Sequence, residues 1–319
     1  MKKVLCFGEV LIDFLPNEDD ETSFKPIAGG APANVAVAIA KLGGESFFVG
    51  GIGSDNFGLF LQKQLAAYRV NTNYLRSFEN SNSALVLVSL DDKKERSFSF
   101  YRHDTADMLF SSEDFSEESF QQSDIFHYCS NTLTTEKLAQ TTLAGLRLAK
   151  VHQLVVSLDV NLRLTLWSEA SVLSSRILEC LPHTDIIKFS REELLYLSEQ
   201  LGKSADELVS YCLETGPSLV VVTDGGNEIS VHTREFHFIR QAPAITPVDT
   251  TAAGDAFVGG LLYQLAQKNV DVAAFQALLT QQAQVEEIID FATECGAVTC
   301  TRKGAFPALP VREDINKLN

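Results

Sequence analysis

The sequence predicts a three-layer α/β/α fold, built on a mostly parallel twisted sheet and carrying a small β-sheet lid. From residue 123 onward, short apolar segments alternate with longer segments whose apolar residues recur at helical spacing. The short segments are apolar throughout, which is typical of parallel strands covered by helices on both faces. Two further segments, 84–90 and 96–101, alternate in the manner of a hairpin around a polar turn at 91–94 and are therefore assigned to an accessory sheet.

Strands and helices follow one another along the chain. The strands of the main sheet are expected at 4–8, 47–52, 124–129, 154–159, 186–189 and 219–223. The first helix is expected between the glycine pairs at 29–30 and 43–44, and the second after the segment 53–58, ending at about 68. Further helices are expected at 135–150, at 170–181, within 191–215, at 256–267 and within 271–295. A second hairpin (228–231 with 235–240) and an extended segment (243–248) precede the helix at 256–267.

The first of these helices has a distinctive start. Gly29 and Gly30 stand before it, and Pro32 occupies an early helical position, where proline is tolerated. Its many alanines predict close packing against a neighbouring element. Asn34 lies inside this helix, where asparagine is unfavourable, and this suggests that the side chain serves a purpose.

No linker, repeat or low-complexity tract divides the chain. We therefore predict one α/β domain over residues 1–319. The extended acidic segment that starts at residue 14 and the hairpin are expected to build the lid, formed by about 14–30 and 84–109.

Composition excludes several classes of partner. The net charge of −16 and the pI near 4.8 argue against binding to nucleic acid or to an anionic membrane surface. The six cysteines are scattered without a metal-ligand spacing, as expected for reduced thiols in a cytoplasmic protein. Glu9 and Asp13 interrupt the apolar N-terminal segment, so we expect a buried strand there and no signal peptide. No stretch approaches the roughly 20 apolar residues that span a bilayer.

The segment Asp249-Thr-Thr-Ala-Ala-Gly-Asp-Ala-Phe257 is the strongest candidate for chemistry. It is a turn of small residues that opens a helix, and the free N–H groups of such a turn bind anions. Asp255 would repel a phosphate bound there, yet it is well placed to take a proton from a nucleophile that attacks the phosphate. The alternative is that Asp255 only caps the helix.

Other candidates follow from the position of ligands in open α/β sheets, beyond the carboxyl ends of the strands. The residues at these ends form a polar rim that contains glycines, and they are Asp13, Gly29, Gly30, Asn34, Ser130, Asn131, Asp159 to Arg163, Ser190 to Glu193, Thr223 to Gly226, and Asp249 to Asp255. Structural roles remain open for Asp13 (a turn), Arg163 (a surface cation) and Thr223 to Gly226 (a hairpin turn). The sequence contains no Walker loop, no dinucleotide-binding fingerprint and no nucleophile elbow.

Two motifs near opposite ends of the chain resemble the signatures of the PfkB (ribokinase-type) carbohydrate kinases. They are Gly29-Gly-Ala-Pro-Ala-Asn34 and the segment from Asp249 to Phe257. The order of strands and helices between them also fits this family, so the resemblance covers the whole chain and implies a ribokinase-like fold. Within the family, Phe100-Tyr-Arg102 and Ala106-Asp-Met-Leu109 are most similar to bacterial fructokinases.

The resemblance implies a role for each matching position. Asp255 matches the catalytic base, and Ala252, Ala253 and Gly254 match the anion hole for the transferred phosphate. The sugar would be bound by Asp13, Gly29, Gly30, Asn34, Arg102 and Arg163. The nucleotide would be bound by Lys188, Thr223, Gly225 and Gly226.

The resemblance also implies ATP as co-substrate and Mg²⁺, organised by Glu193 through water. Ser190 stands where the family usually has asparagine. Asp249 and Thr251 match a loop that holds a monovalent cation in many members, which makes K⁺ a candidate activator. Glu228 replaces a family glycine near the nucleotide loop. Ala252 also replaces a frequent glycine, and a negative φ would accommodate its methyl group.

The function implied is an ATP-dependent kinase that converts fructose to fructose 6-phosphate. Alternatives are a kinase for ribose, 2-keto-3-deoxygluconate or a nucleoside, and a non-catalytic sugar or nucleotide sensor. The presence of Asp255 and Gly254 argues against a sensor, which needs no base. The exposed edges of the lid are suited to pairing in a homodimer.

Overall fold

The computed structural model describes residues 1–17, 20–90, 96–167 and 169–317, and these contain two sheets. The larger has the strand order β13-β12-β11-β10-β9-β8-β1-β4-β5. Its strands are β1 (Lys3–Phe7), β4 (Glu45–Gly53), β5 (Leu75–Phe78), β8 (Ile125–Cys129), β9 (Val155–Asp159), β10 (Ile186–Ser190), β11 (Leu219–Thr223), β12 (Glu228–His232) and β13 (His237–Gln241). All pairings from β5 to β11 are parallel, whereas β12 and β13 are antiparallel. The mostly parallel sheet is thus confirmed, and the second predicted hairpin extends it at one edge.

Helices cover both faces of this sheet. The longer helices are α1 (Ala31–Lys41), α2 (Asn56–Ala67), α5 (Glu136–Val151), α6 (Ala170–Cys180), α7 (Arg191–Gln200), α8 (Ala205–Thr215), α9 (Ala253–Gln267) and α11 (Gln282–Cys300). Shorter ones are α3 (Ala106–Leu109), α4 (Glu117–Gln121) and α10 (Val272–Leu278). No helix within the described residues combines the length and the apolar composition needed to cross a bilayer.

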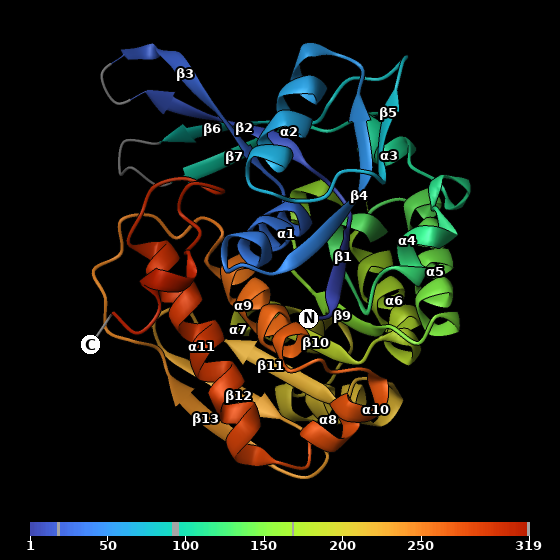
Figure 1. Ribbon diagram of the computed structural model, residues 1–319, viewed down its shortest axis with the longest axis vertical. Helices are drawn as coiled ribbons and strands as arrows, with labels where there is room; N and C mark the ends of the chain where they lie inside the picture. The colour runs from blue at the N-terminus through green and yellow to red at the C-terminus, as the bar shows by residue number, and fades with distance from the viewer. Residues whose placement is uncertain (18–19, 91–95, 168, 318–319) are drawn as a thin grey trace.

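The two faces of the sheet have separate hydrophobic cores, because successive residues of a strand point to opposite sides. In β1, Val4 and Cys6 pack with residues of α1, α9 and α11, whereas Leu5 and Phe7 pack with residues of α5 to α8. The three-layer arrangement is therefore confirmed. Figure 1 shows α1, α9 and α11 next to one another, with the smaller sheet at one end of the molecule.

The smaller sheet has the strand order β3-β2-β6-β7. Its strands are β2 (Leu11–Asn17), β3 (Asp20–Gly29), β6 (Leu85–Leu90) and β7 (Arg96–Tyr101). The segment expected to be a single extended stretch from residue 14 is thus a pair of antiparallel strands that begins at Leu11. The turn predicted at 91–94 lies outside the described residues.

Three other boundaries differ from the prediction. Helix α9 begins at Ala253, before the predicted residue 256, because the small residues of the turn already adopt helical geometry. Helix α11 continues to Cys300, beyond 295. Strand β5 was not predicted, since its four residues carry no clear alternation.

Close packing of α1 against a neighbouring element was predicted from its alanines and is confirmed, and the neighbour is α9. A Cβ atom added to Gly259 of α9 would lie 2.5 Å from the Cβ of Ala38 in α1. The two helices therefore meet through small side chains, which allow a close approach.

We expect Gly259→Ala to lower the free energy of unfolding by about 1–3 kcal/mol, because the added methyl group overpacks this contact. Urea denaturation measures the change. Gly226→Ala is the matched control, since a Cβ there meets nothing within 4 Å. Equal stability of the two variants would contradict the close contact.

Candidate active site

Asp255 is buried in the first turn of α9, as predicted. Its carboxylate accepts two hydrogen bonds from side-chain amides. Asn34 Nδ2 of α1 donates to Oδ2 at 2.7 Å, and Asn161 Nδ2, just beyond β9, donates to Oδ1 at 2.9 Å. The carboxylate is thus held between two elements that are distant in sequence, which a simple helix cap does not require.

The environment raises the pKa of Asp255 to about 6. Burial is the main cause, and repulsion from Asp159 adds to it. The hydrogen bond from Asn34 and the charges of Arg163 and Lys188 act in the opposite direction. A pKa near neutrality suits a general base, because the group is ionised at pH 7 and can still accept a proton.

A buried ion pair lies next to this carboxylate. Lys188 Nζ of β10 is 3.0 Å from Asp159 Oδ1 of β9, and both side chains are buried. Burial lowers the pKa of Lys188, but Asp159 and Glu193 outweigh it and the net shift is upward, so the lysine is charged. Its Nζ lies 3.2 Å from the position that a Cβ on Gly254 would occupy. The predicted nucleotide residue Lys188 therefore lies beside the predicted anion hole.

Ala252 has a backbone conformation that the sequence prediction did not anticipate. The prediction tolerated its methyl group if φ was negative, whereas the observed φ is +61°, in the left-handed region. This conformation costs alanine roughly 1 kcal/mol more than glycine. It makes Ala252 the N-cap residue, so that the N–H groups of Gly254 and Asp255 lie at the open end of α9, while that of Ala253 donates to the carbonyl oxygen of Thr250 at 3.3 Å.

The predicted sugar residues Asp13, Gly29 and Gly30 surround the start of α1. Gly30 has φ +108°, and a Cβ on it would lie 2.5 Å from the carbonyl oxygen of Glu9. A Cβ on Gly29 would lie 2.5 Å from Asp13 Oδ2. A side chain at either position would collide with these oxygen atoms, so the close contacts of this turn require both glycines.

The two candidate arginines differ in environment. Arg102 is buried and its Nε donates to Asp107 Oδ2 at 2.5 Å, while its Nη2 donates to the carbonyl oxygen of Asn131 at 3.2 Å. Arg163 is exposed and its Nη1 donates to its neighbour's carbonyl oxygen. Its charge nevertheless reaches Asp255, as the pKa of that carboxyl shows.

The remaining candidates lie in turns beyond β10 and β11 and before α9. Gly225 and Gly226 lie in the exposed turn between β11 and β12, with φ +54° at Gly225, and Thr223 is the half-buried last residue of β11. This position is compatible with the hairpin role as well as with nucleotide binding.

Glu193 is engaged at the start of α7. Its two carboxylate oxygens accept from the N–H of Leu162 at 2.8 Å and of Ser190 at 2.7 Å. The capping box with Ser190 explains why serine can replace the family asparagine here. Remaining lone pairs of the carboxylate can accept water, which fits the predicted indirect role toward Mg²⁺.

Asp249 fixes the loop before α9. Its Oδ1 accepts from the N–H of Thr251 and its Oδ2 from the N–H of Gly304, both at 2.9 Å. The carboxylate thus ties this loop, which was predicted to hold a monovalent cation, to the segment after α11.

Sequence reasoning gave no role to Glu9 and Asp107, whose carboxylates are buried. Asp107 pairs with Arg102, and Glu9 accepts from Asn131 Nδ2 at 2.9 Å. The position of Glu9 in the sequence could have indicated a role at the site, because it follows the end of β1 by two residues.

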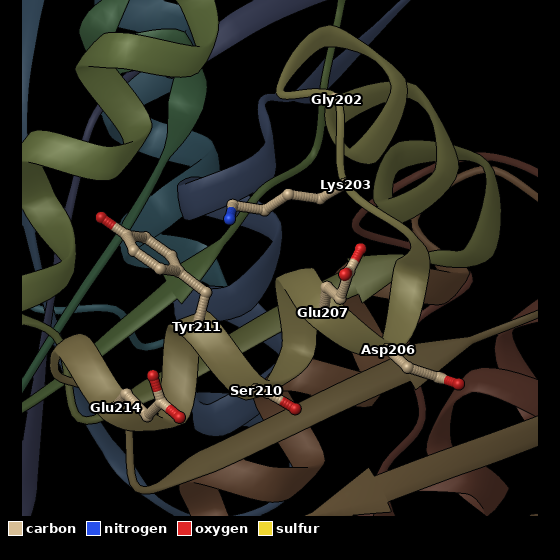
Figure 2. Close-up of a pocket in the computed structure, with 7 residues that line it drawn as sticks. All are labelled: Gly202, Lys203, Asp206, Glu207, Ser210, Tyr211 and Glu214. Atoms are coloured by element: carbon tan, nitrogen blue, oxygen red, sulfur yellow. The ribbon is translucent and has the colours of Figure 1, made fainter.

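A surface pocket of about 420 Å³ lies elsewhere (Figure 2). It is lined by Gly202, Lys203, Asp206, Glu207, Ser210, Tyr211 and Glu214, from α8 and the turn before it. None of the predicted site residues is among them. The candidate site is therefore the cluster around Asp255, and this pocket is separate from it.

Comparison with known proteins shows the class of protein to which this fold belongs, a carbohydrate kinase. The profile of the pfkB family carbohydrate kinases matches residues 1–312, and the chain belongs to this family. A curated relative, the probable fructokinase-6, chloroplastic, of Arabidopsis thaliana, is 38% identical over 319 residues, covering 98% of this chain and 81% of that protein.

Solved structures agree. The fructokinase of Xylella fastidiosa with bound ATP is similar with a TM-score of 0.95 and 40% identity, over 99% of this chain and 97% of that chain. Aminoimidazole riboside kinase of Salmonella enterica, solved with aminoimidazole riboside and an ATP analogue, has a TM-score of 0.84 and 31% identity, over 99% of each chain.

The raised pKa of Asp255 predicts the pH dependence of turnover. The base must be ionised, so kcat/KM should be level above the pKa of about 6 and fall about tenfold per pH unit below it. In Asp159→Asn the repulsion is removed, and the midpoint of this fall should move to lower pH. Initial rates between pH 4.5 and 8 measure both profiles.

The matched control is Asp185→Asn. Asp185 also pairs with a lysine, Lys150, but it precedes β10 and so lies at the opposite end of the sheet. Its profile should coincide with that of the wild type. If the fall of kcat/KM at low pH had the same midpoint in all three proteins, this fall could not be assigned to Asp255.

Proposed function

We propose that the protein is an ATP-dependent fructokinase that transfers the γ-phosphate of ATP to D-fructose, giving fructose 6-phosphate. The observation that carries the proposal is the Asp255 carboxylate, held by two asparagines at the open N-terminus of α9. The fructokinases among its relatives support fructose as the acceptor. A fructokinase of Vibrio cholerae O395, solved in a form with fructose, ADP and potassium ion, is 35% identical.

The proposed mechanism gives one task to each part of the site. Asp255 takes the proton of the attacking hydroxyl. The N–H groups of the predicted anion hole stabilise the charge on the transferred phosphoryl group, and the Nζ of Lys188, although paired with Asp159, lies beside Gly254 as a further donor. Asp13, Gly29, Gly30 and Asn34 orient the sugar at the start of α1.

The residues present also fit the predicted ions. Glu193 would hold Mg²⁺ through water, which would neutralise phosphate charge. Asp249 and Thr251 would shape the loop for K⁺, next to the anion hole. The segment of 14–30 with 84–109 would act as a lid on a single domain of residues 1–319.

Assembly and location belong to the same proposal. We infer a homodimer through the smaller sheet, whose exposed Phe24 and Tyr101 offer apolar contacts. A net charge of −16 supports the absence of nucleic-acid partners. A reducing, cytoplasmic location is supported by the buried free thiols of Cys6, Cys129, Cys180, Cys212 and Cys295.

Asp255→Asn tests the proposed function. The variant should bind fructose and ATP near normally, because the amide keeps the shape of the side chain. Turnover should fall by roughly 10²-fold or more, as expected for the loss of a general base. Coupled ADP release measures turnover, and calorimetry measures binding. Near-normal turnover would eliminate the mechanism.

A nucleoside kinase is the second candidate, favoured by the similarity to aminoimidazole riboside kinase. Phosphate transfer to fructose, ribose, 2-keto-3-deoxygluconate and a nucleoside separates these acceptors. The acceptor with the highest kcat/KM is the assigned one. A sugar or nucleotide sensor would consume no ATP with any of them.

Replacing tetramethylammonium chloride with potassium chloride at the same ionic strength should raise turnover, because an ion in the loop at Asp249 would fix the N–H groups of the anion hole. In Asp249→Ala, which loses the hydrogen bonds to Thr251 and Gly304, the response should be absent. Equal rates of the wild type in both salts would contradict a role for K⁺.

A further inference from the structure

Three neighbouring strands of the main sheet place a polar residue at the same position beyond their carboxyl ends. Glu9 follows the last residue of β1 by two positions, Asn131 follows that of β8, and Asn161 follows that of β9. The strand order β9-β8-β1 puts Asn131 between the other two. Since adjacent strands lie about 4.8 Å apart, Asn131 belongs to the same layer of side chains as Asn161, which contacts the catalytic base.

Hydrogen bonding fixes the orientation of the Asn131 amide. Its Nδ2 donates to Glu9 Oε1 at 2.9 Å, and because a carboxylate can only accept, the amide oxygen must point elsewhere. Asn131 is 5% exposed, and its Oδ1 is buried without a hydrogen-bond partner. The Oγ of Ser130 has no partner either. Buried acceptors without a donor are rare in folded proteins and ask for an explanation.

Asn34 and Asn161 show the same arrangement. Each donates its amide N–H to Asp255, and each leaves a buried Oδ1 without a partner. Asn34 is a predicted sugar residue, so an unpartnered amide oxygen is already a property of this site. Asn131 repeats the pattern with Glu9 in place of Asp255.

Two further contacts place Asn131 among the predicted sugar residues. Glu9, which is 2% exposed, also accepts from the N–H of Ala31 at 3.4 Å, and its carbonyl oxygen packs against Gly30. The carbonyl oxygen of Asn131 accepts from Arg102 Nη2 at 3.2 Å. Asn131 is therefore connected to both Gly30 and Arg102.

We propose that Asn131 contacts the acceptor sugar, and that its Oδ1 accepts a hydrogen bond from one sugar hydroxyl. Glu9 is the positioning residue that turns this oxygen toward the sugar. The inference rests on the proposed function, in which the acceptor is a polyhydroxylated sugar. A ligand that lacks the hydroxyl leaves the oxygen buried and unsatisfied, so the contact selects for the pattern of hydroxyls.

Asn131→Ala should raise the KM for D-fructose about tenfold, as expected for the loss of a hydrogen bond to a ligand. The value of kcat and the KM for ATP should change little, because the contact is made equally in the ground state and the transition state. Thr132→Val is the matched control in the same turn. The Thr132 hydroxyl donates to the carbonyl oxygen of Cys129, so its loss should leave the KM for fructose unchanged.

Analogues of fructose that each lack one hydroxyl distinguish a direct contact of Asn131 with the sugar from a purely structural role of this residue. For one analogue, Asn131→Ala should show the same affinity as the wild type, because the contact is missing in both. For the other analogues the tenfold loss should persist. A loss of equal size for every analogue, or no loss for fructose, would overturn the proposal.

Calorimetric binding of the same analogues gives this comparison without turnover. A wild type that does not phosphorylate fructose would contradict the proposed function, while the binding data still decide on Asn131. If Asn131→Ala does not fold, Asn131→Ser serves instead, since its shorter side chain also withdraws the acceptor. It should show the same dependence on one hydroxyl, and equal losses for all analogues would again overturn the proposal.

Discussion

The buried carboxylate of Asp255 is the constraint on which the rest of the site depends. Burial raises its pKa to about 6, whereas the general base that we propose it to be must stay ionised to accept a proton. Burial and the nearby charge of Asp159 favour the protonated form. The amide of Asn34 and the cations Arg163 and Lys188 favour the ionised form. The pKa of Asp255 is set by the balance of these opposing effects. Because electrostatic effects depend on distance, this pKa depends on where the contributing residues lie.

The fold holds the residues around Asp255 in their positions. Asn34 comes from α1, Asn161 from the segment after β9, Lys188 from β10 and Asp255 from α9. These elements are far apart in sequence and meet because parallel strands present their carboxyl ends at one edge. The contact of Gly259 with Ala38 then sets how closely α1 and α9 approach. Because Asn34 and Asp255 lie in the first turns of these two helices, a change in helix separation would lengthen the hydrogen bond between them.

The sequence predicts the local parts of this arrangement better than the contacts between them. Asp255 in a first helical turn, the glycine pair before α1 and the alternation of strands and helices all follow from spacing along the chain. The role of Glu9 does not, because its partners Asn131 and Ala31 become neighbours only when β1, β8 and α1 assemble. The left-handed φ of Ala252 was also beyond prediction, since the residue type disfavours it and the surrounding turn imposes it. Likewise, residue spacing could not show that β12 and β13 extend the main sheet.

The acidity of the protein imposes a second condition on the site. A chain with a net charge of −16 repels polyphosphates at long range, so binding must come from donors at short distance. The charge of Lys188 is largely matched by Asp159, and Arg102 is matched by Asp107. Each of these buried cations therefore adds little net charge to the site. Its carboxylate partner instead fixes the direction in which its N–H groups point. The remaining attraction comes from the N–H groups at the start of α9, whose orientation depends on the strained turn at Ala252. In the proposed function the orientation of these N–H groups holds the anion, and the same turn places Asp255 beside it.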